Sequence, residues 1–506
     1  MLTGLAGNPA LPADLLDRLV ALADTALGEL LADRADLSGP QVRALVARCG
    51  SPVAARLARR GLLGEGDPGA DDPEVRLVLL DTTGGPERWA RELARHPDPS
   101  VRTRLAAARH VPADVLAVLA EDADVDVVTE VALSAAPVRP YAETLARHPH
   151  TQVRRALALN GDTPPHLLAA LATDGGRPAA RFCPVCQPNP EPYPGRYCGG
   201  GHESAVSGIR EAAARNPATP PGAVAPLIAD GETFVRWALA GRHDLPPDAY
   251  RRLAVDPIPG VRGEVAANPA IDESLMWEMA ADLTYGVRRE LAHNPRVPID
   301  VLVRLAATTR IGPTPLRRIS SASAAEIELL AGSAVPAVRM LLAQRADLPA
   351  TVIDALAADP DAKVVASIAA NPVLTAGRLR SMVDRHGTRV SFRVAANPAC
   401  PAGLLHHIAV HAPARKALRE IARHANATAP ALLRCLDDDR ARPVAARHPA
   451  LPARTVVELL ADPDPDVVEA AAANPSLPRP AMESLLSGTA QPGAGAGHVL
   501  GQPATG

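Results

Sequence analysis

The chain has 506 residues, of which 47% are hydrophobic but only 2% aromatic, and its formal net charge at pH 7 is -3. This slightly acidic balance excludes a protein that reaches nucleic acid or anionic lipid through bulk positive charge. With so few aromatic side chains, Leu, Val, Ile and Ala must form the core. Thin apolar layers between short helices fit that composition better than one large globular core.

The N-terminal sequence, MLTGLAGNPALPADLL, has no basic segment followed by a long apolar run, so we expect no signal peptide. No stretch approaches the roughly 18 uninterrupted apolar residues that indicate a membrane span. We therefore expect a cytoplasmic protein without a membrane-spanning segment.

Asn-Pro pairs and their equivalents recur at a fixed interval along the chain. Arg242, Asn268 and Asn294 follow one another with a period of 26. Such a period is typical of a solenoid, in which each repeat buries its apolar face only against its neighbours. The repeats start at residues 8, 34, 60, 82, 108, 134, 160, 216, 242, 268, 294, about 320, 345, 371, 397, 424, 448 and 474.

Each repeat begins with the end of one helix and the start of another. Taking the Asn as position 0, the following proline disfavours helical backbone at the Asn, whose amide can bond local backbone groups. A second proline at position +4, such as Pro246, suits the first turn of a new helix. Apolar residues at +7, +8 and +11 then form one face of that helix, as in Val301, Leu302 and Leu305.

A second helix follows in the same repeat. Asp recurs at +14, as in Asp256, and can end the first helix or cap the second. Val recurs at +19 within the second helix, as in Val261. We predict an all-α protein, a HEAT-like α-solenoid of about 17–18 two-helix repeats of period 26, either α/α or α/3₁₀. The repeats align least well at 60–82 and 308–325, where we expect irregular loops.

The repeat motif resembles the leucine-rich repeat variant family. The segments DPIPGVRGEVAAN, from Asp256 to Asn268, and DPDPDVVEAAAANPSLP, from Asp462 to Pro478, carry the resemblance. It covers nearly the whole chain outside one insert and the C-terminal tail. The resemblance implies a right-handed superhelix of alternating α- and 3₁₀-helices with a binding-type function. Because the repeats of that family are usually slightly shorter than those of this chain, HEAT-like stacking of α-helices stays open as an alternative.

One repeat contains an insert with a potential metal site. The interval from Asn160 to Asn216 is more than twice the period of the array, so this repeat carries an insert slightly longer than a repeat itself. The insert contains Cys183 and Cys186 in a CxxC pair, followed by Cys198 and His202. Three thiolates and one imidazole at these spacings match a tetrahedral structural zinc site, and the metal would supply most of the folding energy of so short a segment. Cys49, Cys400 and Cys435 stand alone in helical patterns and are predicted to be buried apolar residues.

Two other interpretations of the insert stay open. Proteins of the leucine-rich repeat variant family are associated with a cysteine-bound 4Fe-4S domain, but that domain is N-terminal and has four cysteines, whereas this segment is internal and has three cysteines and a histidine. The thiols could also be unliganded. We divide the chain into a repeat array over 1–174, the insert over 175–208, a continuing array over 209–486 and a disordered tail over 487–506.

Arginine recurs at +20, so that stacked repeats would carry a ladder of guanidinium groups. If these arginines were exposed and unpaired, they could bind the phosphates of a nucleic acid. If each pairs with an Asp at +14, the ladder is structural instead. We favour the structural interpretation because Asp and Arg recur together. The ladder members are Arg76, Arg102, Arg154, Arg210, Arg236, Arg262, Arg288, Arg339 and Arg442.

No acid, base and nucleophile recur together in a way that predicts catalysis, so we expect no enzyme. The chain is predicted to be a helical-repeat scaffold that mediates protein–protein interaction and carries a structural zinc insert. An iron–sulfur redox or sensing protein and a nucleic-acid-binding repeat protein are the alternatives.

Overall fold

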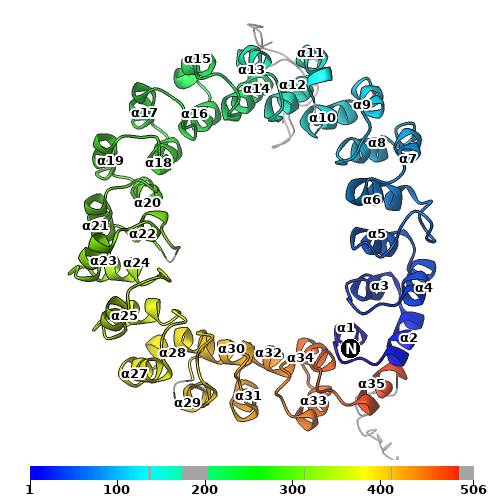
Figure 1. The fold of residues 1–506 in the computed structure, drawn as a ribbon, viewed down its shortest axis with the longest axis vertical. Coiled ribbons are helices and arrows are strands. Elements are labelled where there is room, and N and C mark those ends of the chain that lie inside the picture. Colours follow the sequence, from blue (N-terminus) through cyan, green and yellow to red (C-terminus); the bar gives the residue numbers. More distant parts are fainter. Residues whose placement is uncertain (135–137, 174–202, 313, 412, 489–506) are drawn as a thin grey trace, which may run out of the picture. The chain divides into compact units, whose positions relative to one another are not determined.

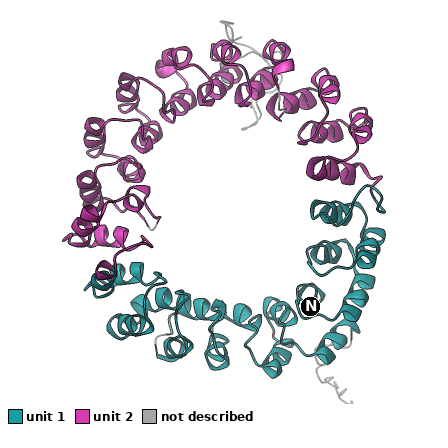
Figure 2. Cartoon of the chain, in the orientation of Figure 1, with its two compact units in different colours: residues 1–69, 353–506 teal, residues 70–352 magenta. Residues whose placement is uncertain are grey.

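The computed structural model describes residues 1–134, 138–173, 203–312, 314–411 and 413–488. Over these residues the chain forms α-helices and no β-strand, which confirms the predicted all-α solenoid. The chain divides into two compact units, one of residues 1–69 and 353–506 (unit 1) and one of residues 70–352 (unit 2; Figure 2).

Unit 2 is a curved stack of helix pairs, with the second helix of each pair on its inner side (Figure 1). Its first helices are α7 (Glu87–Leu93), α9 (Ala113–Ala120), α11 (Arg139–Ala146), α13 (Pro165–Leu171), α15 (Pro221–Val224), α17 (Pro247–Leu253), α19 (Glu273–Met279), α21 (Ile299–Thr308) and α23 (Ala324–Ala331). Its second helices are α6 (Pro73–Thr83), α8 (Pro99–Ala106), α10 (Val125–Ser134), α12 (Thr151–Leu159), α14 (Glu203–Arg215), α16 (Thr233–Ala240), α18 (Pro259–Ala267), α20 (Tyr285–His293), α22 (Arg317–Ser320) and α24 (Pro336–Leu342).

Unit 1 has the same two rows of helices. Its first helices are α2 (Ala13–Leu22), α4 (Gly39–Cys49), α25 (Ala350–Ala357, which spans the boundary between the units), α27 (Ala376–His386), α29 (Ala402–His411), α31 (Ala429–Cys435), α33 (Ala453–Leu459) and α35 (Arg479–Leu486). Its second helices are α1 (Leu2–Ala6), α3 (Thr25–Leu31), α5 (Ser51–Arg59), α26 (Ala362–Ile368), α28 (Thr388–Ala395), α30 (Arg415–Arg423), α32 (Arg442–Ala446) and α34 (Pro465–Ala472).

The prolines and polar residues act at the helix ends as the sequence predicts. Pro246 has φ -65° and ψ 152° and directly precedes α17. Asn268 ends α18 in extended backbone, with φ -74° and ψ 122°, because Pro269 disfavours a helical conformation before it. A 3₁₀ segment, η2 (Ala225–Ala229), follows α15, but the second helices are α-helical, so the α/α form of the prediction is the one observed. The handedness of the superhelix stays a prediction.

The core consists of aliphatic layers between neighbouring repeats. The valines at +19, including Val235, Val261 and Val287, are at most 1% exposed. The two regions of weak repeat alignment are irregular, as predicted: a loop separates α5 from α6, and the four-residue α22 follows another loop after α21. In the described part of the chain, no helix is long and apolar enough to cross a membrane.

Candidate functional site

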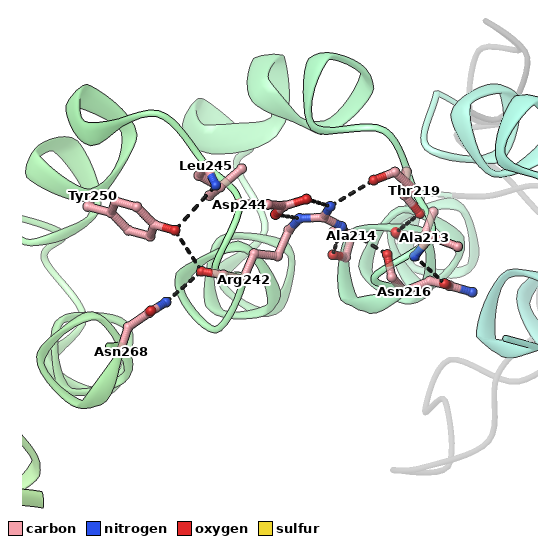
Figure 3. Close-up of polar contacts among 10 residues, drawn as sticks. Ala213, Ala214, Asn216, Thr219, Arg242, Asp244, Leu245, Tyr250 and Asn268 are labelled. Atoms are coloured by element: carbon pink, nitrogen blue, oxygen red, sulfur yellow. Dashed lines mark hydrogen bonds and ion pairs between the residues drawn. The ribbon is translucent and has the colours of Figure 1, made fainter. Parts of the chain in front are cut away.

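A buried row of polar side chains at position 0 links each repeat to the one before it. Asn268 is 3% exposed, and its Oδ1 accepts from the backbone N–H of Ala270 at 2.9 Å, which is the local turn contact that the sequence predicts. In addition, its Nδ2 donates to two carbonyls of the preceding repeat, that of Ala240, at 2.8 Å, and that of Arg242, at 2.5 Å. Figure 3 shows the bond to Arg242. This second contact was not predicted from the sequence.

Arginine and histidine replace asparagine at this position without breaking the row. Arg242 is 6% exposed and donates from Nη1 to the carbonyls of Ala214, at 3.1 Å, and Asn216, at 2.9 Å (Figure 3). Its charge is balanced by Asp244, at 2.6 Å. His448 accepts at Nδ1 from the N–H of Ala450, at 3.1 Å, which leaves Nε2 to donate to the His424 carbonyl at 3.2 Å. Burial lowers the pKa of His448, which favours this neutral form.

The row also passes the predicted insert. Asn216 Nδ2 donates to the carbonyls of Ala158, at 2.9 Å, and Asn160, at 3.0 Å, although Asn160 is 56 residues away in sequence. The repeats on either side of the insert therefore stack in the same register as the others.

Several of the arginines at +20 pair with aspartates in the following repeat. Arg236 Nε donates to Asp256 at 2.6 Å, and Arg262 Nε donates to Asp282 at 2.8 Å. Burial alone would raise the pKa of Asp256, but the hydrogen bond from Arg236 and that from the Ile258 N–H keep it below its usual value. The same pairing joins Arg102 to Asp122, Arg210 to Asp230 and Arg442 to Asp462. These pairs support the structural interpretation and remove the basis for a phosphate-binding ladder at those positions.

The four predicted metal ligands, Cys183, Cys186, Cys198 and His202, lie outside the described residues, and so does the tail from 489 onward. Among the residues that the structure describes, no three His, Cys, Asp or Glu side chains come together as a metal site would require. Cys49, Cys400 and Cys435 are buried, as predicted, and burial raises the pKa of Cys400 and of Cys435 to about 12. These two thiols are therefore protonated at neutral pH and poorly reactive.

Two aromatic side chains stand exposed on the inner row of unit 2. Phe234 is 65% exposed and Trp237 37% exposed, and both belong to α16. Residues three apart lie on the same face of a helix, so the two rings share one surface. The chain has 11 aromatic residues (3 Phe, 3 Trp and 5 Tyr). Two of them are exposed together on α16, and this distinguishes its surface from that of the aliphatic repeats around it.

The neighbouring repeat holds the indole in a defined orientation. A Cβ atom at Gly260 would lie 2.5 Å from the six-membered ring of Trp237, so glycine at this point of α18 is what lets the ring lie against the helix. The indole Nε1 donates to Glu264, also on α18, at 3.1 Å. The aromatic side chain is thus fixed before any partner binds, which reduces the entropy lost on binding.

A hollow of about 740 Å³ opens beside the two rings. Its lining includes apolar and aromatic side chains, and its charged side chains, which we call its rim, carry both signs. Glu264 and Asp244 are acidic, whereas Arg215 is basic and already pairs with Glu211 at 2.9 Å. We call this the aromatic hollow. It is lined by Arg215, Pro217, Phe234, Trp237, Ala238, Gly241, Arg242, His243, Asp244 and Glu264.

The aromatic hollow was not predicted from the sequence. Two features of the sequence could have indicated it: the spacing of Phe234 and Trp237, and Gly260, which occupies the position in the next repeat that corresponds to Phe234. Neither feature is recognisable without comparing equivalent positions of neighbouring repeats.

No protein-family model matches the chain, and no curated protein matches it either. A solved structure described as a leucine-rich repeat variant with a novel repetitive protein structural motif is similar to it, with 20% sequence identity and a TM-score of 0.28. The similarity covers 51% of this chain and 88% of that chain. That description names the family that the repeat motif resembles.

Proposed function

We propose that the chain is a non-enzymatic helical-repeat scaffold that binds a protein partner at the aromatic hollow of unit 2. The observation that carries the proposal is the exposed pair Phe234 and Trp237, with the indole held by Gly260 and Glu264. Aromatic side chains held beside a hollow that also carries polar groups are the usual anchors of protein interfaces.

The charges around the hollow favour a polypeptide over a nucleic acid. The rim combines acidic Glu264 and Asp244 with basic groups that already have carboxylate partners, so it offers no unbalanced positive surface to phosphates. An apolar side chain of the partner would enter the hollow, and the mixed rim would hydrogen-bond to its backbone and polar groups. The repeat framework keeps the site in place, because the position-0 contacts hold α14, α16 and α18 in register.

Site-specific photo-crosslinking tests this proposal. A photoreactive phenylalanine analogue at position 234 is expected to crosslink to a discrete protein in the native cell. The adduct should be lost when Trp237→Ala is added. The matched control is the same analogue at Leu329, which is 63% exposed on the first helix α23 and lies outside the hollow. Identical adducts from positions 234 and 329, or adducts that persist with Trp237→Ala, would contradict the proposed binding site.

We further propose a structural zinc ion in the insert, held by Cys183, Cys186, Cys198 and His202. Ligand type and spacing support this proposal. Elemental analysis of the purified protein should find about one zinc per chain, and Cys183→Ser should lose it while the helical circular dichroism of the repeats persists. A brown protein with visible absorption after anaerobic purification would indicate the iron–sulfur alternative instead.

A further inference from the structure

Helices α35 and α1 are different halves of the repeat. Helix α35 follows the position-0 residue Asn474 and is a first helix. Helix α1 directly precedes the position-0 residue Asn8 and therefore occupies the place of a second helix. In the repeat pattern a second helix packs after a first helix, so α1 is the kind of helix that would follow α35.

The two halves come together inside unit 1. Helix α1 contacts both α34 and α35, and α2 packs beside α35 (Figure 1). Asn8 Nδ2 donates to the carbonyls of Ala472, at 3.0 Å, and Asn474, at 2.8 Å. Asn474 makes the equivalent pair of bonds to Ala446, at 2.7 Å, and His448, at 3.0 Å. The row of position-0 contacts therefore continues from the last repeat to the first.

The packing of this joint is as close as that within the array. Asn8 and Leu5 are both fully buried. A Cβ atom at Gly4 would lie 2.9 Å from the Ala472 Cβ and closer still to the Glu469 carbonyl oxygen, so only glycine allows α1 to approach α34 so closely.

The first helices α2 and α35 add polar contacts between exposed side chains at this joint. Arg479 donates to Asp14 at 2.6 Å, and Arg18 donates to Ser487 at 3.3 Å. The joint thus combines buried polar contacts with an ion pair between the first turns of α2 and α35.

We infer that residues 1–22 are a built-in binding partner for the edge formed by α34 and α35, and that they are held there by a non-covalent joint. Successive repeats are tied by the peptide chain as well as by packing, whereas α35 and α1 are held to each other by packing and hydrogen bonds. A solenoid edge without a covering element exposes apolar side chains and unpaired carbonyls, which is why terminal repeats need caps. Here the occupant of that edge is the beginning of the same chain, and the inference is independent of the proposed partner at the aromatic hollow.

Hydrogen–deuterium exchange on the full-length chain tests the inference. Asn8→Ala should speed exchange at least tenfold in peptides covering α34 and α35, even though Ala472 lies 464 residues from Asn8 in sequence. Peptides covering α18 and α20 should not change. Asn8→His is the matched variant, because His448 makes the corresponding bond, and it should preserve most of the protection. Unchanged exchange in α34 and α35 with Asn8→Ala would overturn the inference.

A photo-crosslink shows whether residues of the same chain or of a second copy occupy the edge formed by α34 and α35. A photoreactive phenylalanine analogue at Gly7, whose Cβ would lie 3.7 Å from Arg447 Nη2, should crosslink to the peptide that contains Arg447 and leave the mass of a single chain. A crosslink at twice that mass would show that a second copy occupies the edge and would overturn the assignment to the same chain. Absence of any crosslink to residues 440–487 would overturn the joint itself.

Discussion

Replacing Asn294 with alanine tests whether the position-0 contacts hold the repeats together. Asn294 is fully buried, and its Nδ2 donates to the carbonyls of Ala266, at 2.9 Å, and Asn268, at 2.7 Å. Its Oδ1 accepts from the Arg296 N–H at 2.9 Å. Leaving a buried hydrogen-bonding group without its partner costs about 1–3 kcal/mol, so the loss of these three bonds should destabilise the local stack by about 3 kcal/mol or more.

The readout is local exchange rather than global unfolding alone, because a repeat array unfolds in parts. A loss of about 3 kcal/mol corresponds to roughly a hundred-fold faster exchange for amides in α18 and α20. Asn294→His should lose much less, since His448 fills the same position in another repeat. Asn294→Asp keeps the acceptor for Arg296 but turns a second oxygen toward two carbonyls, so it should be at least as damaging as alanine.

Comparing the stability of Asn294→Asp with that of Asn294→Ala tests whether the inter-repeat bonds from Nδ2 or the local turn made by Oδ1 stabilises the stack. If the aspartate variant is as stable as the native protein, then the inter-repeat bonds from Nδ2 contribute little. The local turn made by Oδ1 would then be the whole role of the position-0 residue.

Three further predictions follow from other contacts. Arg236→Met leaves the Asp256 carboxylate, whose side chain is 4% exposed, without its guanidinium partner. This substitution should destabilise unit 2 by about 3 kcal/mol, measured by urea denaturation. The double variant Arg236→Met with Asp256→Leu should recover most of that loss. Hydrogen bonds from Arg318 and Ser323 lower the pKa of Glu326 from 4.5 to about 2, so its contribution to stability is present above pH 4.5 and is lost as the pH falls toward 2. Glu326→Gln should therefore reduce the loss of α23 protection between pH 5 and pH 3, and an unchanged loss would contradict this assignment. Gly260→Ala should displace the Trp237 indole, shift its fluorescence and abolish crosslinking from position 234, whereas Gly286→Ala, at the same phase of the next repeat with no atom within 4 Å, should do none of these.

The fold could be predicted from the sequence because its determinants are local and recur. Pro269 ends α18 and Pro246 precedes α17 through backbone geometry that depends only on adjacent residues. The pairing of Arg236 with Asp256 was also within reach, because both residue types recur at fixed phases. Repetition makes such a side chain recognisable even without knowledge of its neighbours.

The aromatic hollow and the joint between the chain ends depend on single residues and could not be predicted in that way. The position in the next repeat that corresponds to Trp237 is Gly263, so the repeat pattern did not indicate a functional role for Trp237. The joint brings Asn8 to Asn474, whose separation of 466 residues carries no local signal.

The contact between Asn216 and Asn160 has a consequence for how such a chain can acquire new parts. Since stacking is governed by side chains that bond the preceding repeat, the segment between the two helices of a repeat is free to vary in length without changing the spacing of its neighbours. Guest sequences could be grafted at the equivalent turn of other repeats, for example between α17 and α18, to display several modules at intervals set by the scaffold.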